Sequence, residues 1–261
     1  MLARREFPQP VLGPRSVLYK ALSSPTPLIE LWGSGPYSLK WALLDGEEVL
    51  ELGVGREAVV ACLKGSCSVG CELGSAELAA KDVAYASGPA TLELRGRGSL
   101  VVVGEAPSRS EGVWLVRRFS ELKPLLVGSE GYRRHVYTAL GVGDPSTSLL
   151  AGFTEGFPGE WTSFPPHKHD DKVEVYVYYG LGGGFGVQVV EDEDGADAYV
   201  VGDYDAVLIL RGYHPNTAAP GYRICYLWIL CQVRGEKSMR ATVKPGFERF
   251  QAGPTHLQLE R

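Results

Sequence analysis

Short apolar runs, separated by turns rich in glycine and proline, recur along the whole chain and constrain its fold more than any other feature. The runs at 58–63, 172–179 and 222–230 are rich in β-branched and aromatic residues, which favour strands. Helical periodicity is weak, and its best example, at 119–127, is interrupted by Pro124. Many short strands joined by frequent turns predict an all-β sandwich, barrel or jelly roll.

The two halves of the chain are similar in sequence. Two segments of the first half align without gaps with two of the second: 56–70 with 173–187, and 83–90 with 207–214. The alignment pairs Glu57 with Glu174 and Gly88 with Gly212. We therefore predict two similar β-barrels in tandem. Residues 1–115 would form the N-terminal barrel, and residues 116–261 would form a connecting segment and the C-terminal barrel.

Composition and charge exclude several classes of protein. Hydrophobic residues make up 44% of the chain, enough for a sizeable core, and the net charge of -5 excludes a strongly basic nucleic-acid binder. No apolar run approaches the roughly 20 residues that cross a bilayer, and the first ten residues lack the apolar core of a secretory signal. None of the five cysteines forms a CxxC pair, which predicts buried thiols in a reducing compartment. We expect a cytoplasmic homo-oligomer that binds neither nucleic acid nor membrane.

The positions of the five histidines give the strongest indication of chemistry. His167 and His169 alternate with Lys168, so on a strand both imidazoles point to one face. Glu174 follows five residues after the second histidine, and His214 lies just after an Arg-Gly turn at the end of a later strand. Three imidazoles and one carboxylate are a ligand set for a divalent ion of the zinc, manganese, iron or nickel group. A surface cluster of histidines without a metal is the alternative.

The segments around these residues resemble a known pair of motifs. GEWTSFPPHKHDDKVEVYVYY and GDYDAVLILRGYHPNTAAPGY resemble the two cupin motifs. More narrowly, WTSFPPHKHD and RGYHPNTAAPGY resemble the 5-deoxy-glucuronate isomerase family of inositol catabolism, whose superfamily includes 5-keto-4-deoxyuronate isomerase. The spacing in HKHDDKVEVYVYY is more similar to the second family. The resemblance covers most of the chain and implies a bicupin, that is, two tandem double-stranded β-helix (jelly-roll) barrels.

The resemblance also implies roles for individual residues. The residues at metal-ligand positions are His167, His169, Glu174 and His214. The residues at positions that would bind the substrate are Arg134, Gln188 and Arg211. The planar donor fork of an arginine suits the carboxylate of a sugar acid.

The N-terminal barrel has no comparable ligand set. In the repeat alignment, Leu50, Leu52 and Ala90 stand where the three histidines stand, and no histidine precedes His135. The remaining carboxylate, Glu57, is then expected to be solvated or salt-bridged. The sequence therefore predicts one metal site, in the C-terminal barrel.

The function that the resemblance implies is a metal-dependent aldose–ketose isomerase, an intramolecular oxidoreductase acting on a small deoxy uronic acid. The first candidate reaction converts 5-deoxy-glucuronate to 5-dehydro-2-deoxy-gluconate, and 5-keto-4-deoxyuronate is the alternative substrate. The metal would acidify a C–H bond beside a carbonyl group, and a base would move the proton. The candidate bases are Glu174, Tyr178, Lys168 and a hydroxide on the metal. Another metal cupin enzyme, such as a dioxygenase, and a non-catalytic cupin that binds sugar acids remain open.

Overall fold

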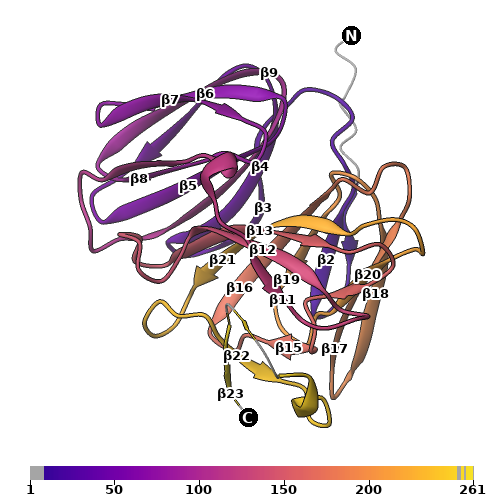
Figure 1. Ribbon diagram of the computed structural model, residues 1–261. Helices are drawn as coiled ribbons and strands as arrows, with labels where there is room; N and C mark the ends of the chain where they lie inside the picture. The colour runs from indigo at the N-terminus through magenta and orange to yellow at the C-terminus, as the bar shows by residue number, and fades with distance from the viewer. Residues whose placement is uncertain (1–8, 252–253, 256, 261) are drawn as a thin grey trace.

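The computed structural model describes residues 9–251, 254–255 and 257–260, and it consists mainly of β-strands and turns (Figure 1). The helical elements in these ranges are two 3₁₀ turns, η1 (Phe119–Glu121) and η2 (Glu248–Phe250). The all-β prediction is confirmed. No helix among the described residues has the length and hydropathy that a membrane span needs.

The first large sheet is built from the first half of the chain and has the order β10-β8-β5-β9-β4-β3. Its strands, with the β6–β7 hairpin beside β9, are β3 (Thr26–Ser34), β4 (Tyr37–Leu52), β5 (Arg56–Lys64), β6 (Ser66–Cys71), β7 (Gly74–Ala79), β8 (Val83–Ser87), β9 (Ala90–Pro107) and β10 (Trp114–Arg117). The long strands β4 and β9 pair over most of their length, from Ser38 opposite Glu105 to Leu52 opposite Ala90. The first part of β9 pairs with β6 and its last part with β5, so β9 takes part in two layers. Between these layers lies an apolar core.

The second large sheet has the order β1-β2-β19-β16-β21-β13-β12-β11. Its strands are β1 (Val11–Leu12), β2 (Ser16–Tyr19), β11 (Leu125–Val127), β12 (Arg134–Leu140), β13 (Leu149–Gly156), β16 (Lys172–Tyr179), β19 (Ala206–Ile209) and β21 (Cys225–Gln232). β2 pairs with β19, so residues 11–19 belong to this sheet, whereas the sequence prediction assigned them to the first barrel. In Figure 1 the indigo strand β2 lies beside the orange and salmon strands of the second half.

Two smaller sheets complete the second half of the molecule. One has the order β14-β20-β17-β18, and the other has the order β15-β22-β23. Their strands are β14 (Trp161–Thr162), β17 (Gly186–Asp192), β18 (Gly195–Val201), β20 (Asn216–Ala218), β15 (His167–Lys168), β22 (Arg240–Val243) and β23 (Gln258–Glu260). β22 and β23 come from the C-terminal part of the chain; β22 pairs with β15, which carries the first predicted ligand, and β23 pairs with β22.

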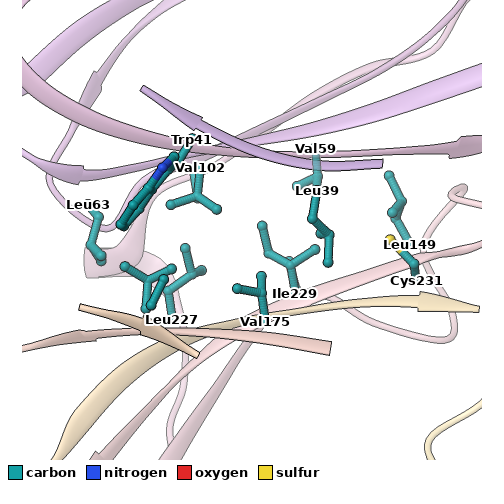
Figure 2. Close-up of a cluster of buried hydrophobic side chains, with 14 of the residues drawn as sticks. Leu39, Trp41, Val59, Leu63, Val102, Leu149, Val175, Leu227, Ile229 and Cys231 are labelled. Carbon is teal, nitrogen blue, oxygen red and sulfur yellow. The ribbon is translucent and has the colours of Figure 1, made fainter. Parts of the chain in front are cut away.

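The two large sheets pack face to face through a shared apolar core. Leu39, Trp41 and Val59 of the first sheet point toward Val175, Leu227 and Ile229 of the second, as Figure 2 shows. The second sheet is therefore covered on this face by the first half of the chain. Its other face lines the interior of the second half, where a second cluster of buried side chains covers it. Since both faces are covered, β16 and β21 are buried almost along their whole length, which explains their continuous apolar sequences.

The internal repeat corresponds to a common strand order. In the first sheet the order β8-β5-β9-β4-β3 matches β19-β16-β21-β13-β12 of the second. The predicted pairing of Glu57 with Glu174 is nevertheless wrong, because the two side chains point to different faces of their sheets. The neighbours Ala58 and Val60 face the core of the first half, which leaves Glu57 facing the second sheet, whereas Glu174 faces the interior of the second half. A shift of one residue reverses the face of every side chain on a strand.

Candidate metal centre

The four predicted metal ligands meet at one end of the inner face of the second sheet. β15 carries His167, and the backbone N–H of His214 donates to the carbonyl of His167. Glu174 lies on β16, between Ile209 of β19 and Leu230 of β21. The ligand atoms of the three histidines lie within 4.8 Å of one another. Strand pairing therefore brings together residues that the sequence places in three separate segments.

Each of the three imidazoles is held by its Nδ1 atom. The Nδ1 atoms of His167, His169 and His214 lie 2.9, 2.7 and 3.0 Å from the backbone carbonyls of Pro165, Arg240 and Gly212. A carbonyl oxygen accepts hydrogen bonds, so each Nδ1 must carry the proton in the neutral ring. Each Nε2 is then unprotonated, and its lone pair is available to coordinate a metal. Three fixed Nε2 lone pairs in one small volume are the arrangement that a metal ion needs.

Glu174 adds a carboxylate to this cluster. Its Oε2 lies 3.2 Å from Nε2 of His214 and 3.9 Å from Nε2 of His169. Although the shorter distance is within hydrogen-bonding range, the geometry does not form a hydrogen bond, and both Oε2 of Glu174 and Nε2 of His214 are buried without a partner. Buried polar atoms without partners are costly, and a divalent cation would satisfy all of these atoms together. The donor set therefore fits a metal ion.

The electrostatic environment keeps the histidines ready to bind a metal. Burial, together with the neighbouring imidazoles of His214 and His169, lowers the pKa of His167 well below its usual value. Burial lowers the pKa of His169 to about 3, with His214 as the next largest cause. Both rings are therefore neutral at pH 7, and the neutral ring is the form that coordinates a metal.

A small cavity of about 20 Å³ lies beside this cluster. Its lining residues are Arg134, Thr154, Ser163, His167, His169, Glu174, Tyr176, Tyr226, Trp228, Leu230, Met239 and Leu257. The cross-strand pairs Tyr176–Trp228 and Thr154–Tyr226 extend the inner face away from Glu174. Gly152 leaves room for the indole of Trp228, because a Cβ atom at this position would overlap both the indole and the carbonyl of Tyr137.

Arg134 is the other charged group of the cavity. Its side chain is almost fully buried, with 2% of the residue exposed, and burial lowers the pKa of its guanidinium. The hydrogen bond that the described residues give this guanidinium runs from Nη1 to the carbonyl of Tyr132, and they give it no ion pair. A buried cation without a counter-ion is strongly unfavourable. The position predicted to bind a carboxylate therefore has an unmatched positive charge.

The structure does not bring two other predicted site residues, Tyr178 and Gln188, to the cavity. The Tyr178 hydroxyl donates to Oε1 of Gln188 at 2.6 Å, and Asn216 donates to the same oxygen at 2.9 Å. Nε2 of Gln188 donates to the carbonyl of His214 at 2.9 Å. Since both side chains are fully buried in this network, Gln188 supports the turn that carries His214 and is not placed to bind a substrate.

Two further predicted site residues, Lys168 and Arg211, also lie outside the cavity. Lys168 is 31% exposed and pairs with Asp170 at 2.9 Å, because it faces away from the two histidines that flank it. Arg211 is 52% exposed and lies 3.3 Å from Asp192 and 3.7 Å from Asp194. Neither side chain lines the cavity.

Several cavity residues were not assigned a role from the sequence. Ser163, Thr154 and Tyr226 are common residue types in unremarkable contexts, and they come from separate strands and loops. Met239 and Leu257 come from the C-terminal segment, whose path over the cavity has no sequence signal. Tyr176 shares a face with Glu174 on β16, as strand alternation predicts, and it lines the cavity.

Comparisons with known proteins find related sequences and a related fold. The model of the KduI/IolB family matches residues 32–249, which is most of the chain. The 5-deoxy-glucuronate isomerase of Geobacillus kaustophilus is 35% identical over 122 residues, which cover 42% of this chain and 44% of that protein. The 4-deoxy-L-threo-5-hexosulose-uronate ketol-isomerase of Opitutus terrae is 31% identical over 90 residues, which cover 34% of this chain and 32% of that protein. The chain thus spans less than half the length of these curated relatives.

A solved structure resembles most of the chain in its fold. The crystal structure of an IolB-like protein from Salmonella typhimurium LT2 aligns with a TM-score of 0.78 and 19% sequence identity. The alignment covers 90% of this chain and 99% of that one. At this level of identity the likeness concerns the fold.

Proposed function

The chain belongs to the KduI/IolB family, and we propose that it is a metal-dependent aldose–ketose isomerase acting on a deoxy uronic acid. The proposed reaction converts 5-deoxy-glucuronate to 5-dehydro-2-deoxy-gluconate. The observation that carries the proposal is a buried guanidinium, given no ion pair by the described residues, that lines the same cavity as three converging imidazoles and a carboxylate. These groups suit a small molecule with a carboxylate and with oxygen atoms that can bind a metal.

The residues that would hold the metal are His167, His169, Glu174 and His214. A divalent ion at this position would polarise the carbonyl group of the substrate and stabilise negative charge on its oxygens. Zinc, manganese, iron and nickel all suit this mixture of imidazole and carboxylate ligands. The carbonyl groups that hold each Nδ1 fix the tautomer and the orientation of the ligands.

Arg134 would bind the carboxylate of the substrate. Its guanidinium is already desolvated, so an ion pair formed there would cost little further dehydration and would be strengthened by the low local dielectric. The carboxylate would neutralise the buried positive charge. This arrangement would orient the chain of the sugar acid with its opposite end toward the histidines.

Isomerisation moves one hydrogen between adjacent carbons and one proton between their oxygens. Glu174 is the one carboxylate among the residues that line the cavity, and its Oε2 has no hydrogen bond. We keep it as the candidate base for the carbon-bound proton, in addition to its role as a ligand. Tyr178 and Lys168 lie outside the cavity and are therefore weaker candidates.

We also propose that the two halves are the two barrels of a bicupin. The common strand order of the two large sheets supports this interpretation. The division then differs from 1–115 and 116–261: the first barrel is formed by residues 26–117, and the second by residues 11–19 together with residues from 125 onward.

A cytoplasmic homo-oligomer is part of the proposal. The five cysteines are free thiols, which suits a reducing compartment. Leu125 and Leu126 are exposed on β11, the edge strand of the second sheet, and could pair with another copy. Light scattering of the purified protein would give the number of copies.

The test is an NMR assay of the metal-loaded protein with 5-deoxy-glucuronate in deuterated water, together with elemental analysis of the bound metal. We expect conversion to the ketose, one equivalent of metal, and loss of both in His169→Ala. The matched control is His135→Gln, because His135 packs against Phe157 outside the cavity. Absence of both conversion and deuterium incorporation in the metal-loaded wild type would refute the proposal.

A second substrate is favoured by the similarity to a ketol-isomerase. The Opitutus terrae relative acts on 4-deoxy-L-threo-5-hexosulose-uronate by its name. This compound also combines a carboxylate with adjacent oxygens, and the same assay with each compound at equal concentration compares their kcat/KM values. A higher value for the hexosulose uronate would reassign the substrate and leave the site unchanged.

A further inference from the structure

Ser163 has a backbone conformation that is uncommon for its residue type. Its φ angle is 51°, in the left-handed region that favours glycine. The residue is buried between two fixed neighbours. The Thr162 side chain is hydrogen-bonded to Asn216, and the Phe164 ring packs 5.2 Å from the rings of both Tyr132 and Phe250. These contacts hold the strained conformation in place, and such strain is often found at functional sites.

The conformation of Ser163 places its hydroxyl at the wall of the cavity. Its Oγ lies 3.3 Å from the hydroxyl of Tyr176, and both residues line the cavity. Two hydroxyl groups that share one hydrogen bond leave one hydrogen free to donate elsewhere. A glycine would adopt the same backbone conformation without strain, but it would supply no hydroxyl.

The pair lies at the metal end of the cavity. Tyr176 is two residues along β16 from Glu174 on the same face, and its ring centre is 5.9 Å from that of His214. The guanidinium of Arg134 belongs to the same small cavity as the hydroxyl pair. A substrate that contacts both Arg134 and the histidine cluster would therefore lie against Ser163 and Tyr176.

We infer that Ser163 and Tyr176 form a hydroxyl pair that donates a hydrogen bond to the reacting oxygen of the substrate. The inference rests on the proposed function and assigns two contact residues to it. In the enediolate that forms between aldose and ketose, negative charge develops on this oxygen. A fixed donor aimed at such an oxygen stabilises the transition state more than the ground state. The first hydroxyl donates to the second, which polarises the second toward the substrate.

Three variants separate this role from a structural one. Ser163→Ala removes the hydroxyl and keeps the strain, whereas Ser163→Gly removes both. We expect kcat to fall by about 10²-fold in both variants with a small change in KM, since one oxyanion donor contributes about this much. The glycine variant should melt about 2–4 °C above the alanine variant. Tyr176→Phe removes the partner hydroxyl and should lower kcat to a similar extent.

The matched control is Tyr179→Phe, because Tyr179 lies on the same strand β16 and its hydroxyl donates to Glu155 outside the cavity. Its kcat should stay near that of the wild type, and all four variants should retain one equivalent of metal. The inference is overturned if Ser163→Gly keeps the wild-type kcat, or if activity in the two Ser163 variants follows melting temperature.

Failure of the proposed function gives a different result. If the wild type converts neither uronate, isomerase activity is refuted before any variant is considered. Calorimetric titration of zinc-loaded protein with 5-deoxy-glucuronate then tests the pair alone. Weaker binding to both Ser163 variants than to the wild type supports a contact with the ligand, and equal binding overturns it.

Discussion

The two halves of the molecule share a strand order but enclose different interiors. In the first half, the space between the layers is filled by alanine, valine, leucine and cysteine side chains, all buried. In the second half, the equivalent face of the sheet carries Glu174, Tyr176 and Arg134 around a cavity. The common sheet therefore provides a scaffold, and the residues on one face of it decide whether the interior is a packed core or a site.

The two glutamates of the repeat make this difference concrete. Glu57 is fully buried and accepts hydrogen bonds from the Tyr85 hydroxyl and from the backbone N–H groups of Thr147, Ser148 and Leu149. The sequence predicts a solvated or salt-bridged carboxylate at this position, and the structure shows neither. Glu57 instead joins the two halves through its hydrogen bonds. Glu174 has one oxygen without any donor. A buried carboxylate with every donor in place is structural, and one without donors indicates a missing cation.

The largest expected effect comes from Glu174→Gln. The substitution removes the charge with little change of shape, so metal binding should be lost and kcat/KM should fall by about 10³-fold. The metal-free variant should unfold at the same or a higher urea concentration than the metal-free wild type, because a buried carboxylate without donors is removed. Elemental analysis and urea titration measure both effects. A variant that keeps its metal would show that the three histidines suffice.

Glu57→Gln should have the opposite effect to Glu174→Gln: it should lower stability and leave metal binding unchanged. Its carboxylate accepts hydrogen bonds from three backbone N–H groups, and an amide would turn its NH₂ toward some of them. We expect the free energy of unfolding to fall by roughly 3 kcal/mol, with the metal content unchanged. Glu51→Gln is the control, because Glu51 is exposed and bonds to Thr91 alone. Loss of metal in Glu57→Gln would show that the joint between the halves also shapes the site.

The pattern of strands and the metal ligands could be predicted from the sequence because each leaves a local signal. A histidine pair separated by one residue marks one short segment, Glu174 follows on the next strand, and His214 comes shortly after the end of a later strand. The strand phase of the repeat could not be predicted in the same way. Both faces of β5 and of β16 are buried, so the apolar pattern does not distinguish inside from outside, and a match by residue type was off by one position.

The rest of the cavity depends on contacts that are distant in sequence. Ser163, Thr154 and Tyr226 become neighbours only through the pairing of separate strands, and hydroxyl side chains are common everywhere in the chain. Gln188 was placed at the substrate from a resemblance in sequence, but its amide is used up by Tyr178, Asn216 and the carbonyl of His214. Whether a polar side chain already has hydrogen-bond partners depends on the folded structure, so it could not be predicted from the sequence.

Between pH 7 and pH 5, where histidines titrate, the pH dependence of stability should come from the second half. No histidine precedes His135, whereas burial lowers the pKa values of His167 and His169. In the metal-free protein these rings stay neutral when the unfolded chain takes up protons below about pH 6.5. Stability is therefore fully present above that value and falls toward the folded pKa of His169, about 3. The slope should reach up to about 1.4 kcal/mol per pH unit for each histidine.

Urea titrations of metal-free protein at pH 7, 6 and 5 measure this slope. His169→Asn should reduce it, because the unfolded chain then gains one proton fewer. His135→Gln is the comparison, because its ring lies outside the cluster and packs on Phe157. Equal slopes in the wild type and in His169→Asn would mean that the acid sensitivity arises elsewhere in the chain.

The smallest expected effects on stability come from removing two buried tyrosine hydroxyls, one in each half of the molecule. Tyr85 donates to the charged Glu57, and Tyr178 donates to the neutral amide of Gln188. Because a hydrogen bond to a charged group contributes more, Tyr85→Phe should lower the free energy of unfolding by about 2 kcal/mol and Tyr178→Phe by about 1 kcal/mol. Turnover should fall far less in Tyr178→Phe than in Tyr176→Phe, since the hydroxyl of Tyr178 is outside the cavity. An equal loss of kcat in these two variants would restore Tyr178 as the catalytic tyrosine.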